Sequence, residues 1–335
     1  MNIEDSELCS SIRDDFYKMG FGNTPMLVHH MSNGSTIYAK LEFFNPFGSI
    51  KDRGSFFMIE DAIKKSDRNK KLIIVDGSSG NTGIAIGNIC RKLGLESIIF
   101  IPPGTATETR EKLEQSGAQI EVVGESPEST STAMAIERAN KLAIEKPDTY
   151  RFLHQHGNPM NYKAHIYTTG PEALQQMGGS PNYVAIAMGT GGSIIGNGLF
   201  FKERNQDTDV IMMQSNQDAY IQGIRNFMKA KDKVILEKHI SIVDRMLNLS
   251  EKDAENGVKF LIENYELLVG FSAGGNFSGA MKIGEEHPGS RIYTVFPDSG
   301  EKYRNLYLSR NLTTDDDFSS LSKKILDIRK DYVTL

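Results

Sequence analysis

The sequence predicts an α/β fold of two open, twisted, mostly parallel sheets flanked by helices. Short apolar runs alternate with helical patterns along most of the 335 residues, which is typical of parallel strands joined by helices. Several of these runs end in loops rich in glycine and serine that open into a helix. Open α/β sheets bind ligands at such places. The length is sufficient for two domains, and we expect the active site in the cleft between them.

Two series of elements support this fold. In the first half, apolar runs predict strands and periodic segments predict helices, and the two helices between the strands are followed by glycine caps at Gly94 and Gly117. The strands are 72–76, 97–101 and 119–123, and the helices are 55–65, 81–93 and 107–115. In the second half, we expect strands at 183–188, 210–214 and 291–296, and helices at 193–203, 251–265 and 276–285.

Two further segments carry weaker signals. The stretch 219–239 is charged and weakly periodic, and we expect an active-site flap or an irregular connection there. The turn at 313–317 precedes a final amphipathic segment.

Composition excludes several classes of protein. A net charge of −5 argues against a nucleic-acid binder, because phosphate neutralisation needs a basic surface. The acidic, polar residues 1–15 are not a secretory signal, and no apolar run approaches the roughly 20 residues that span a bilayer. Only Cys9 and Cys90 are present, so neither a disulfide framework nor a structural zinc site is indicated. We expect a cytoplasmic protein.

The histidines do not indicate a metal site. His154 and His156 flank Gln155, but no third ligand is close in sequence. The pair His29 and His30 is expected at an ordinary surface or an interface.

The segment NPFGSIKDRG, residues 45–54, places Lys51 between a turn shaped by proline and glycine and a helical run. A lysine at such a junction can form a Schiff base with an aldehyde cofactor. Taken alone, a lysine in this position is more often a solvated surface lysine. The loops downstream decide between these interpretations.

Two loops have the composition of anion sites. Residues 76–83, DGSSGNTG, join a strand to a helix and offer hydroxyls and backbone N–H groups suited to a carboxylate, although a plain helix cap has the same sequence. Residues 189–196, GTGGSIIG, repeat the arrangement and suit a phosphate or a tight structural turn. Ile194 occupies the third glycine position of the dinucleotide fingerprint, and no Lys-Ser/Thr pair follows, so neither that motif nor a Walker loop is present.

Two more loops complete the set. Residues 270–275, GFSAGG, join a short apolar run to a helix, and residues 297–303, PDSGEKY, follow the last predicted strand. In this order, the motifs NTPM, NPFGSIKDR, SSGNTG, GNP, TTGPE, GTGGSIIG, IQGI, the Ser272 loop and DSGEKY, from about residue 23 to 303, resemble the fold type II pyridoxal-phosphate enzymes. Within these, the chain is most similar to the cysteine synthase and cystathionine β-synthase group.

The resemblance implies a role for each cofactor-binding position. Lys51 would hold pyridoxal 5'-phosphate as a Schiff base and, once freed, act as the base toward the substrate α-proton. Asn81 would bond the phenolic oxygen of the cofactor, and Ser272 would face the pyridine nitrogen. The phosphate would lie on the loop formed by Gly189, Thr190, Gly191, Gly192 and Ser193, and Asp298 would complete the cofactor site.

The substrate would be held by a second set of residues. The α-carboxylate would bind Ser78, Ser79, Gly80, Thr82 and Gln155, and Gly223 and Arg225 would contact the rest of the substrate. The resemblance also implies domain roles. A smaller, mobile domain, 41–155, would carry the carboxylate loop, and a larger domain, 1–40 with 156–335, would carry the phosphate loop.

The implied reaction is β-replacement on an activated L-serine. A neutral Ser272 leaves the pyridine ring unprotonated and a weaker electron sink, which favours loss of a β-substituent to an aminoacrylate and then addition of a nucleophile. The leading hypothesis is L-cysteine formation from sulfide and O-phosphoserine or O-acetylserine. The partners would be these small molecules, without nucleic acid or membrane, and the family implies a homodimer.

Two positions depart from the family pattern. Ser78 stands where the family usually has threonine, so a hydroxyl is retained. After IQGI the chain reads Arg225-Asn226-Phe227 in place of small residues. This resembles the branch that uses O-phosphoserine or larger sulfur donors, and Arg225 could pair with a substrate phosphate. A surface arginine on a flap is the alternative.

Other reactions stay open on the sequence. A cystathionine β-synthase and a synthase that uses an amine nucleophile to make diaminopropionate derivatives are close alternatives. A serine/threonine dehydratase or racemase is more distant, and Thr82-Gly83 and DSGEKY argue against it. A degenerate regulatory homologue is opposed by the fact that every position with a chemical role is filled.

Overall fold

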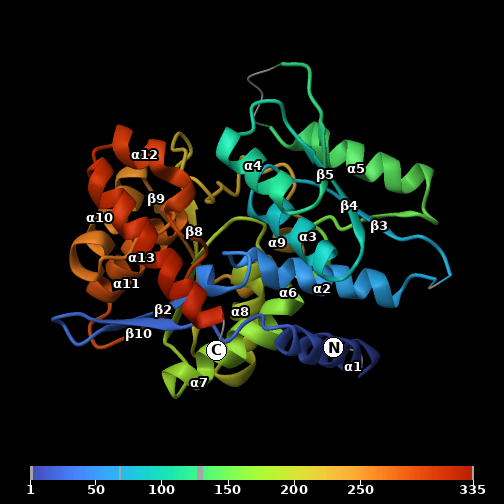
Figure 1. Cartoon of the computed structure of the whole chain (residues 1–335). Coiled ribbons are helices and arrows are strands. Elements are labelled where there is room, and N and C mark those ends of the chain that lie inside the picture. Colours follow the sequence, from blue (N-terminus) through green and yellow to red (C-terminus); the bar gives the residue numbers. More distant parts are fainter. Residues whose placement is uncertain (1–2, 68, 127–130, 334–335) are drawn as a thin grey trace. The chain divides into compact units, whose positions relative to one another are not determined.

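The computed structural model describes residues 3–67, 69–126 and 131–333 and shows two compact α/β units (Figure 1). The smaller unit consists of Met1–Met19 and Lys51–Asn161, and the larger unit consists of Gly20–Ile50 and Tyr162–Leu335. The predicted fold class, two mostly parallel sheets flanked by helices, is confirmed.

The unit boundaries differ from the predicted ones, which placed 1–40 with the larger domain and 41–155 in the smaller one. Helix α1 (Ile3–Lys18) packs with the smaller unit, where Phe16 makes an edge contact with Phe56 of α2 at 5.5 Å between ring centroids. Residues 41–50 belong to the larger unit, because the Ile50 N–H donates to the Pro297 carbonyl at 2.8 Å.

The smaller unit contains a four-stranded parallel sheet in the order β5-β4-β3-β6. Its strands are β3 (Ile73–Gly77), β4 (Glu96–Ile101), β5 (Gln119–Val122) and β6 (Tyr150–Phe152). Its helices are α1, α2 (Lys51–Lys64), α3 (Asn81–Lys92), α4 (Thr107–Gln115) and α5 (Ala133–Glu145). Helix α6 (Pro159–Ala164) spans the boundary to the larger unit.

Apolar side chains hold α5 on this sheet. Val75 and Phe100 pack with Ala135, Ala139 and Leu142, which places α5 beside β3 and β4 (Figure 1). Burial of these side chains is favourable by about 25 cal/mol per Å² of apolar surface. The two cysteines, Cys9 and Cys90, are buried in this unit.

The larger unit contains a six-stranded sheet in the order β1-β2-β10-β7-β8-β9, antiparallel only between β1 and β2. The strands are β1 (Met26–His30), β2 (Thr36–Leu41), β7 (Tyr183–Ala187), β8 (Asp209–Ser215), β9 (Arg245–Leu249) and β10 (Arg291–Phe296). Strands β1, β2 and β9 were not predicted.

The helical elements of the larger unit connect these strands, and the last of them follow β10 in the sequence. They are η1 (Glu42–Phe44), the π-helical turn η2 (His165–Thr169), α7 (Gly170–Met177), α8 (Gly192–Arg204), α9 (Val234–His239), η3 (Ile240–Ile242), α10 (Glu251–Tyr265), α11 (Phe271–Glu286), η4 (Glu301–Tyr303), α12 (Arg304–Ser309) and α13 (Asp315–Val333).

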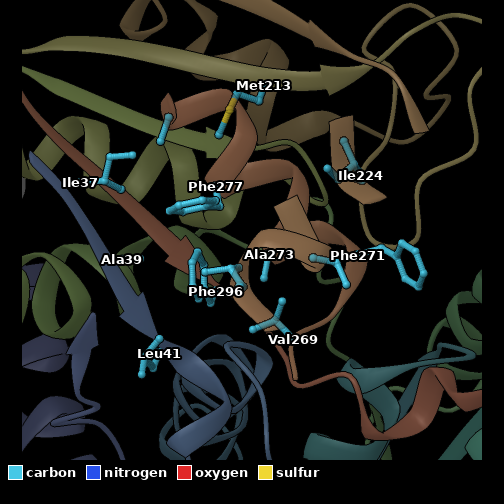
Figure 2. Close-up of a cluster of buried hydrophobic side chains, with 14 of the residues drawn as sticks. Ile37, Ala39, Leu41, Met213, Ile224, Val269, Phe271, Ala273, Phe277 and Phe296 are labelled. Atoms are coloured by element: carbon cyan, nitrogen blue, oxygen red, sulfur yellow. The ribbon is translucent and has the colours of Figure 1, made fainter. Parts of the chain in front are cut away.

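Both faces of this sheet are buried, as parallel sheets require. On one face, Phe277 of α11 packs beside Phe296 of β10 and Met213 of β8, with Ile37 and Ala39 along β2 (Figure 2). On the other face, α8 packs with side chains of β7, β8 and β10. The strand ends are thereby held between two layers of helices, and the loops that follow them are fixed at both ends.

None of the helices in the described residues is long and apolar enough to cross a membrane.

Candidate active site

The turn before Lys51 is attached to the end of β10 in the larger unit. Ser49 pairs with Asp298 in an isolated antiparallel bridge, and the Ile50 N–H donates to the Pro297 carbonyl at 2.8 Å. Lys51 is the next residue and the first of α2, four residues before the predicted start of the helical run at 55. The turn therefore leads directly into the helix. Consecutive Cα atoms are about 3.8 Å apart, so these bonds fix the place from which Lys51 extends.

A buried network of hydrogen bonds and one ion pair stabilises this turn. Asn45 Nδ2 donates to Glu42 Oε2 at 3.0 Å, and Thr24 Oγ1 donates to Glu42 Oε1 at 2.7 Å. Lys40 Nζ donates to the Thr24 carbonyl at 2.8 Å and forms an ion pair with Glu172 at 2.9 Å. Four of these residues are fully buried and Glu172 nearly so. The network joins the motifs NTPM, NPFGS and TTGPE. The sequence alone did not indicate that these three motifs contact one another.

In the smaller unit, Asn161 connects α2 to the predicted substrate residues. A Cβ on Gly54 would lie 2.7 Å from Asn161 Oδ1, so only glycine allows this approach. Asn161 Nδ2 donates to the Gln155 carbonyl at 2.6 Å, and Thr82 Oγ1 donates to Gln155 Oε1 at 2.7 Å. Gln155 and Thr82 are therefore brought together, as the hypothesis of a shared carboxylate site requires.

The loop after β3 is ordered by its first serine. Ser78 Oγ accepts the Gly83 N–H at 3.1 Å, and the Ser78 N–H donates to the Phe100 carbonyl at 3.0 Å. Ser79 and Gly80 are partly exposed, and Asn81 is the first residue of α3. The loop therefore presents the N-terminus of a 12-residue helix, whose first N–H groups and dipole attract an anion.

The loop after β7 has the features of a phosphate site. Gly191 has φ of 92°, a left-handed conformation that favours glycine, and Leu236 of α9 fills the place of its missing Cβ. Thr190 Oγ1 accepts the Gly192 N–H at 3.4 Å. The Ser193 hydroxyl oxygen is buried and has no hydrogen-bond partner among the described residues. A phosphate oxygen at the N-terminus of α8 would supply that partner.

Ser272 lies in the first turn of α11, which corrects the predicted helix start at 276. The chain is helical from Phe271, because Gly270 provides the extended N-cap and its N–H donates to the Asp298 carbonyl at 2.9 Å. Ser272 is buried. A Cβ on Gly223 of the IQGI segment would lie 3.1 Å from Ser272 Cβ and 3.2 Å from Ser272 Oγ. The structure therefore places two predicted site residues, Ser272 and Gly223, side by side.

The Asp298 side chain is engaged with its own loop. Its carboxylate accepts from the Tyr303 hydroxyl at 2.9 Å and forms an ion pair with Lys302 at 2.7 Å. Burial and the adjacent Asp298 charge raise the pKa of Tyr303 well above its usual value, so Tyr303 stays protonated and remains a donor. These contacts stabilise the loop that also holds Ser49 and Ile50.

The stretch 219–239 is mostly irregular, with α9 at its end, as expected for a flap or connection. Arg225 is anchored through its backbone, whose N–H donates to the Met188 carbonyl at 2.8 Å, immediately before the phosphate loop. Its guanidinium donates to the Asp232 carbonyl at 3.0 Å. Burial lowers the pKa of Arg225, and the Asp232 charge partly opposes this. Arg225 is thus a half-buried residue beside Gly189, not a freely extended surface arginine.

Taken together, these residues fit an enzyme that binds pyridoxal phosphate. The larger unit offers an anion loop with an unpartnered hydroxyl at one helix N-terminus and a neutral serine at another. Lys51 follows a turn that is bonded to the same unit. The model of the pyridoxal-phosphate dependent enzyme family matches residues 17–298, and the chain belongs to this family.

Curated relatives agree with this assignment. The chain is 32% identical over 287 residues to a cysteine synthase B of Escherichia coli, with 84% of this chain and 92% of the relative covered. It is 33% identical over 293 residues to a cysteine synthase B of Campylobacter jejuni, with 84% and 94% covered. Among solved structures, an O-acetyl serine sulfhydrylase of Entamoeba histolytica matches with a TM-score of 0.77 and 26% identity, covering 90% of this chain and 94% of that one.

Proposed function

We propose that this enzyme replaces the β-substituent of an activated L-serine, O-acetylserine or O-phosphoserine, with sulfide and releases L-cysteine. The observation that carries the proposal is the position of Ser272, a neutral hydroxyl in the first turn of α11, beside Gly223. A hydroxyl facing the pyridine nitrogen, unlike a carboxylate, favours β-substituent loss over other reactions at the α-carbon. The names of the relatives, cysteine synthase and O-acetyl serine sulfhydrylase, support the same chemistry.

Bound pyridoxal phosphate supplies the electron sink that acidifies the substrate α-proton. In this proposal, Lys51 holds the cofactor in the resting enzyme and its amine accepts that proton during the reaction. Asn81 bonds the phenolic oxygen of the cofactor. The loop Gly189–Ser193 holds the phosphate. The Ser193 hydroxyl, which has no hydrogen-bond partner among the described residues, is one donor to it.

The carboxylate loop orients the substrate in this proposal. Ser78 and Gln155 hold Thr82 and the start of α3 in place through the bonds described above. The N-terminal N–H groups of α3 and the exposed side of Ser79 and Gly80 then receive the α-carboxylate. A fixed carboxylate aligns the α-C–H bond for proton transfer, which is the main contribution of such positioning residues.

We also propose an oligomeric state, a location and a domain movement for this enzyme. The resemblance to the family supports a homodimer, and the composition supports a cytoplasmic location. The smaller unit is proposed to move when substrate binds, because it carries the carboxylate loop while the larger unit carries the phosphate loop.

A substrate panel tests the function. Purified enzyme with pyridoxal phosphate is supplied with O-acetylserine, O-phosphoserine or serine, each with sulfide or homocysteine, and the amino-acid product is identified by mass. Cysteine from sulfide and at least one activated serine is expected. Cystathionine as the main product, or ammonia and a keto acid from serine alone, would contradict the proposal.

A further inference from the structure

Asn276 is a fully buried side chain that joins three elements of the larger unit. It lies on α11, one turn after Ser272. Its Oδ1 accepts the Ala187 N–H of β7 at 2.8 Å, and its Nδ2 donates to the Val295 carbonyl of β10 at 2.7 Å. The carboxamide therefore links α11 to both neighbouring strands through one acceptor and one donor.

These bonds occur where the two strands no longer pair directly. In the described residues, β7 and β10 pair at Tyr183–Ile292 and Val184–Tyr293, although β7 continues to Ala187 and β10 to Phe296. Beyond these pairs, the Asn276 side chain is hydrogen-bonded to the ends of both strands. Burying an amide is costly unless both its donor and its acceptor are satisfied, and here each is.

Each strand end leads into a loop of the proposed site. Ala187 stands two residues before Gly189, the first residue of the phosphate loop. Val295 stands two residues before Pro297, which accepts from Ile50 next to Lys51. Asn276 itself is four residues after Ser272, on the same face of α11. One carboxamide thus sets the spacing of the phosphate loop, the Ser272 hydroxyl and the attachment point of the lysine turn.

We propose that Asn276 is a positioning residue for pyridoxal phosphate and does not itself contact the cofactor. It fixes the distance between the loop Gly189–Ser193, which holds the phosphate, and Ser272, which faces the pyridine nitrogen. This inference rests on the proposed roles of Gly189–Ser193 and Ser272. An aspartate at 276 would keep the acceptor for Ala187 but place a carboxylate oxygen against the Val295 carbonyl, so the two strand ends would separate.

The test measures cofactor binding to the apo-protein. Asn276→Asp and Asn276→Thr are compared with wild type by fluorescence titration with pyridoxal phosphate and by thermal unfolding of the apo-protein. The matched control is Ser278→Ala on the same helix, which removes the bond from Ser278 Oγ to the Asp253 carbonyl at 2.7 Å. We expect at least tenfold weaker cofactor binding in both Asn276 variants and an altered visible spectrum of the bound cofactor. Ser278→Ala should lower thermal stability and leave both cofactor properties unchanged.

Failure of the Asn276 inference and failure of the proposed function would give different results. Wild-type affinity and spectrum in the Asn276 variants, with only thermal stability lowered, would reduce Asn276 to a structural role and overturn the inference. Ser272→Ala is measured in parallel, and an unchanged cofactor spectrum in that variant would instead count against the site assignment.

A measurement on the wild type covers the case in which neither variant folds. The bond from the Ala187 N–H to Asn276 predicts slow hydrogen exchange at that amide in the apo-protein and slower exchange with cofactor bound. Rapid exchange in both forms would overturn the inference.

Discussion

Ser272 and Gly223 lie in contact although 49 positions separate them in sequence. Gly223 has φ of 86°, and a Cβ at this position would lie 3.1 Å from Ser272 Cβ, so Ser272 would have to shift. We predict that Gly223→Ala lowers kcat by tenfold or more and changes the spectrum of the bound cofactor, because the new methyl group displaces the Ser272 hydroxyl. Gly289→Ala is the control, since Gly289 has φ of 78° but open space around it. Both variants should lose about 1–2 kcal/mol of stability from backbone strain. Equal kinetics in the two variants would contradict the role of this contact.

Arg225 is the residue most closely tied to the choice of substrate. Its backbone is bonded to Met188 next to the phosphate loop, and its guanidinium is half-buried. We predict that Arg225→Ala raises KM for O-phosphoserine at least tenfold and leaves KM for O-acetylserine unchanged, because only the phosphate would lose a cationic partner. Steady-state kinetics with both donors measure this difference. Equal changes for both donors would show that Arg225 only supports the flap.

Some residues could be found from the sequence and others could not. Lys51, Asn81, the Gly189 loop and Ser272 stand at junctions between strand and helix patterns, so their motifs were visible. Asn161 and Asn276 bond to backbone groups whose partners depend on how strands and helices pack. Nothing in the local sequence distinguishes them from other helical asparagines.

The interior strands other than β2 were predictable because both of their faces are buried. Strands β3, β4, β7, β8 and β10 therefore read as continuous apolar runs. Strand β1 contains His29 and His30 and is half exposed, and β9 is an exposed edge strand that begins with Arg245. Neither shows the apolar run that marks a buried strand. Helix α11 begins earlier than the predicted start at 276. The glycines before residue 276 were interpreted as a loop, but they belong to the helix and allow close packing on α10.

The packing of α10 on α11 depends on one of these close approaches. A Cβ on Gly257 of α10 would lie 2.0 Å from the Gly274 carbonyl oxygen of α11, and backbone cannot move aside as a side chain can. Gly257→Ala should therefore reduce the free energy of unfolding by about 1–3 kcal/mol. At an exposed helix position without this contact, the same change usually increases it by about 1 kcal/mol. Gly284→Ala is the control, because its Cβ would meet the ends of the Met31 and Ile292 side chains and no backbone atom of another element. Urea unfolding compares the two, and equal stability would contradict this packing.

Within the larger unit, the Lys40 network joins β2 to Thr24 and to α7. Lys40 is fully buried and bonds Glu172, Thr24 and Gln176, which connects distant parts of the chain behind the lysine turn. Lys40→Met should lower the free energy of unfolding by about 3–5 kcal/mol, because Glu172 is left buried without its partner. The double variant Lys40→Met/Glu172→Leu should recover most of this loss in urea unfolding. Additive losses would indicate that the ion pair itself contributes little.

The division into two units also reflects packing that sequence patterns do not encode. Two α/β series were visible along the chain, but α1 joins the smaller unit through aromatic contacts of Phe16. The turn before Lys51 joins the larger unit through backbone pairing with Pro297 and Asp298, directly after β10. The chain therefore passes from one unit to the other between Ile50 and Lys51.

The assignment of Lys51 as the cofactor-binding lysine can be tested in one variant. Lys51→Ala is compared with Lys64→Ala, a lysine on the same helix that bonds Ser11 at 3.1 Å. Absorbance of the purified proteins with pyridoxal phosphate and cysteine formation are measured for both. We expect Lys51→Ala to lose the visible band of the lysine-bound cofactor and all turnover above about 0.1% of wild type, while Lys64→Ala keeps both. A wild-type spectrum and full activity in Lys51→Ala would contradict the assignment.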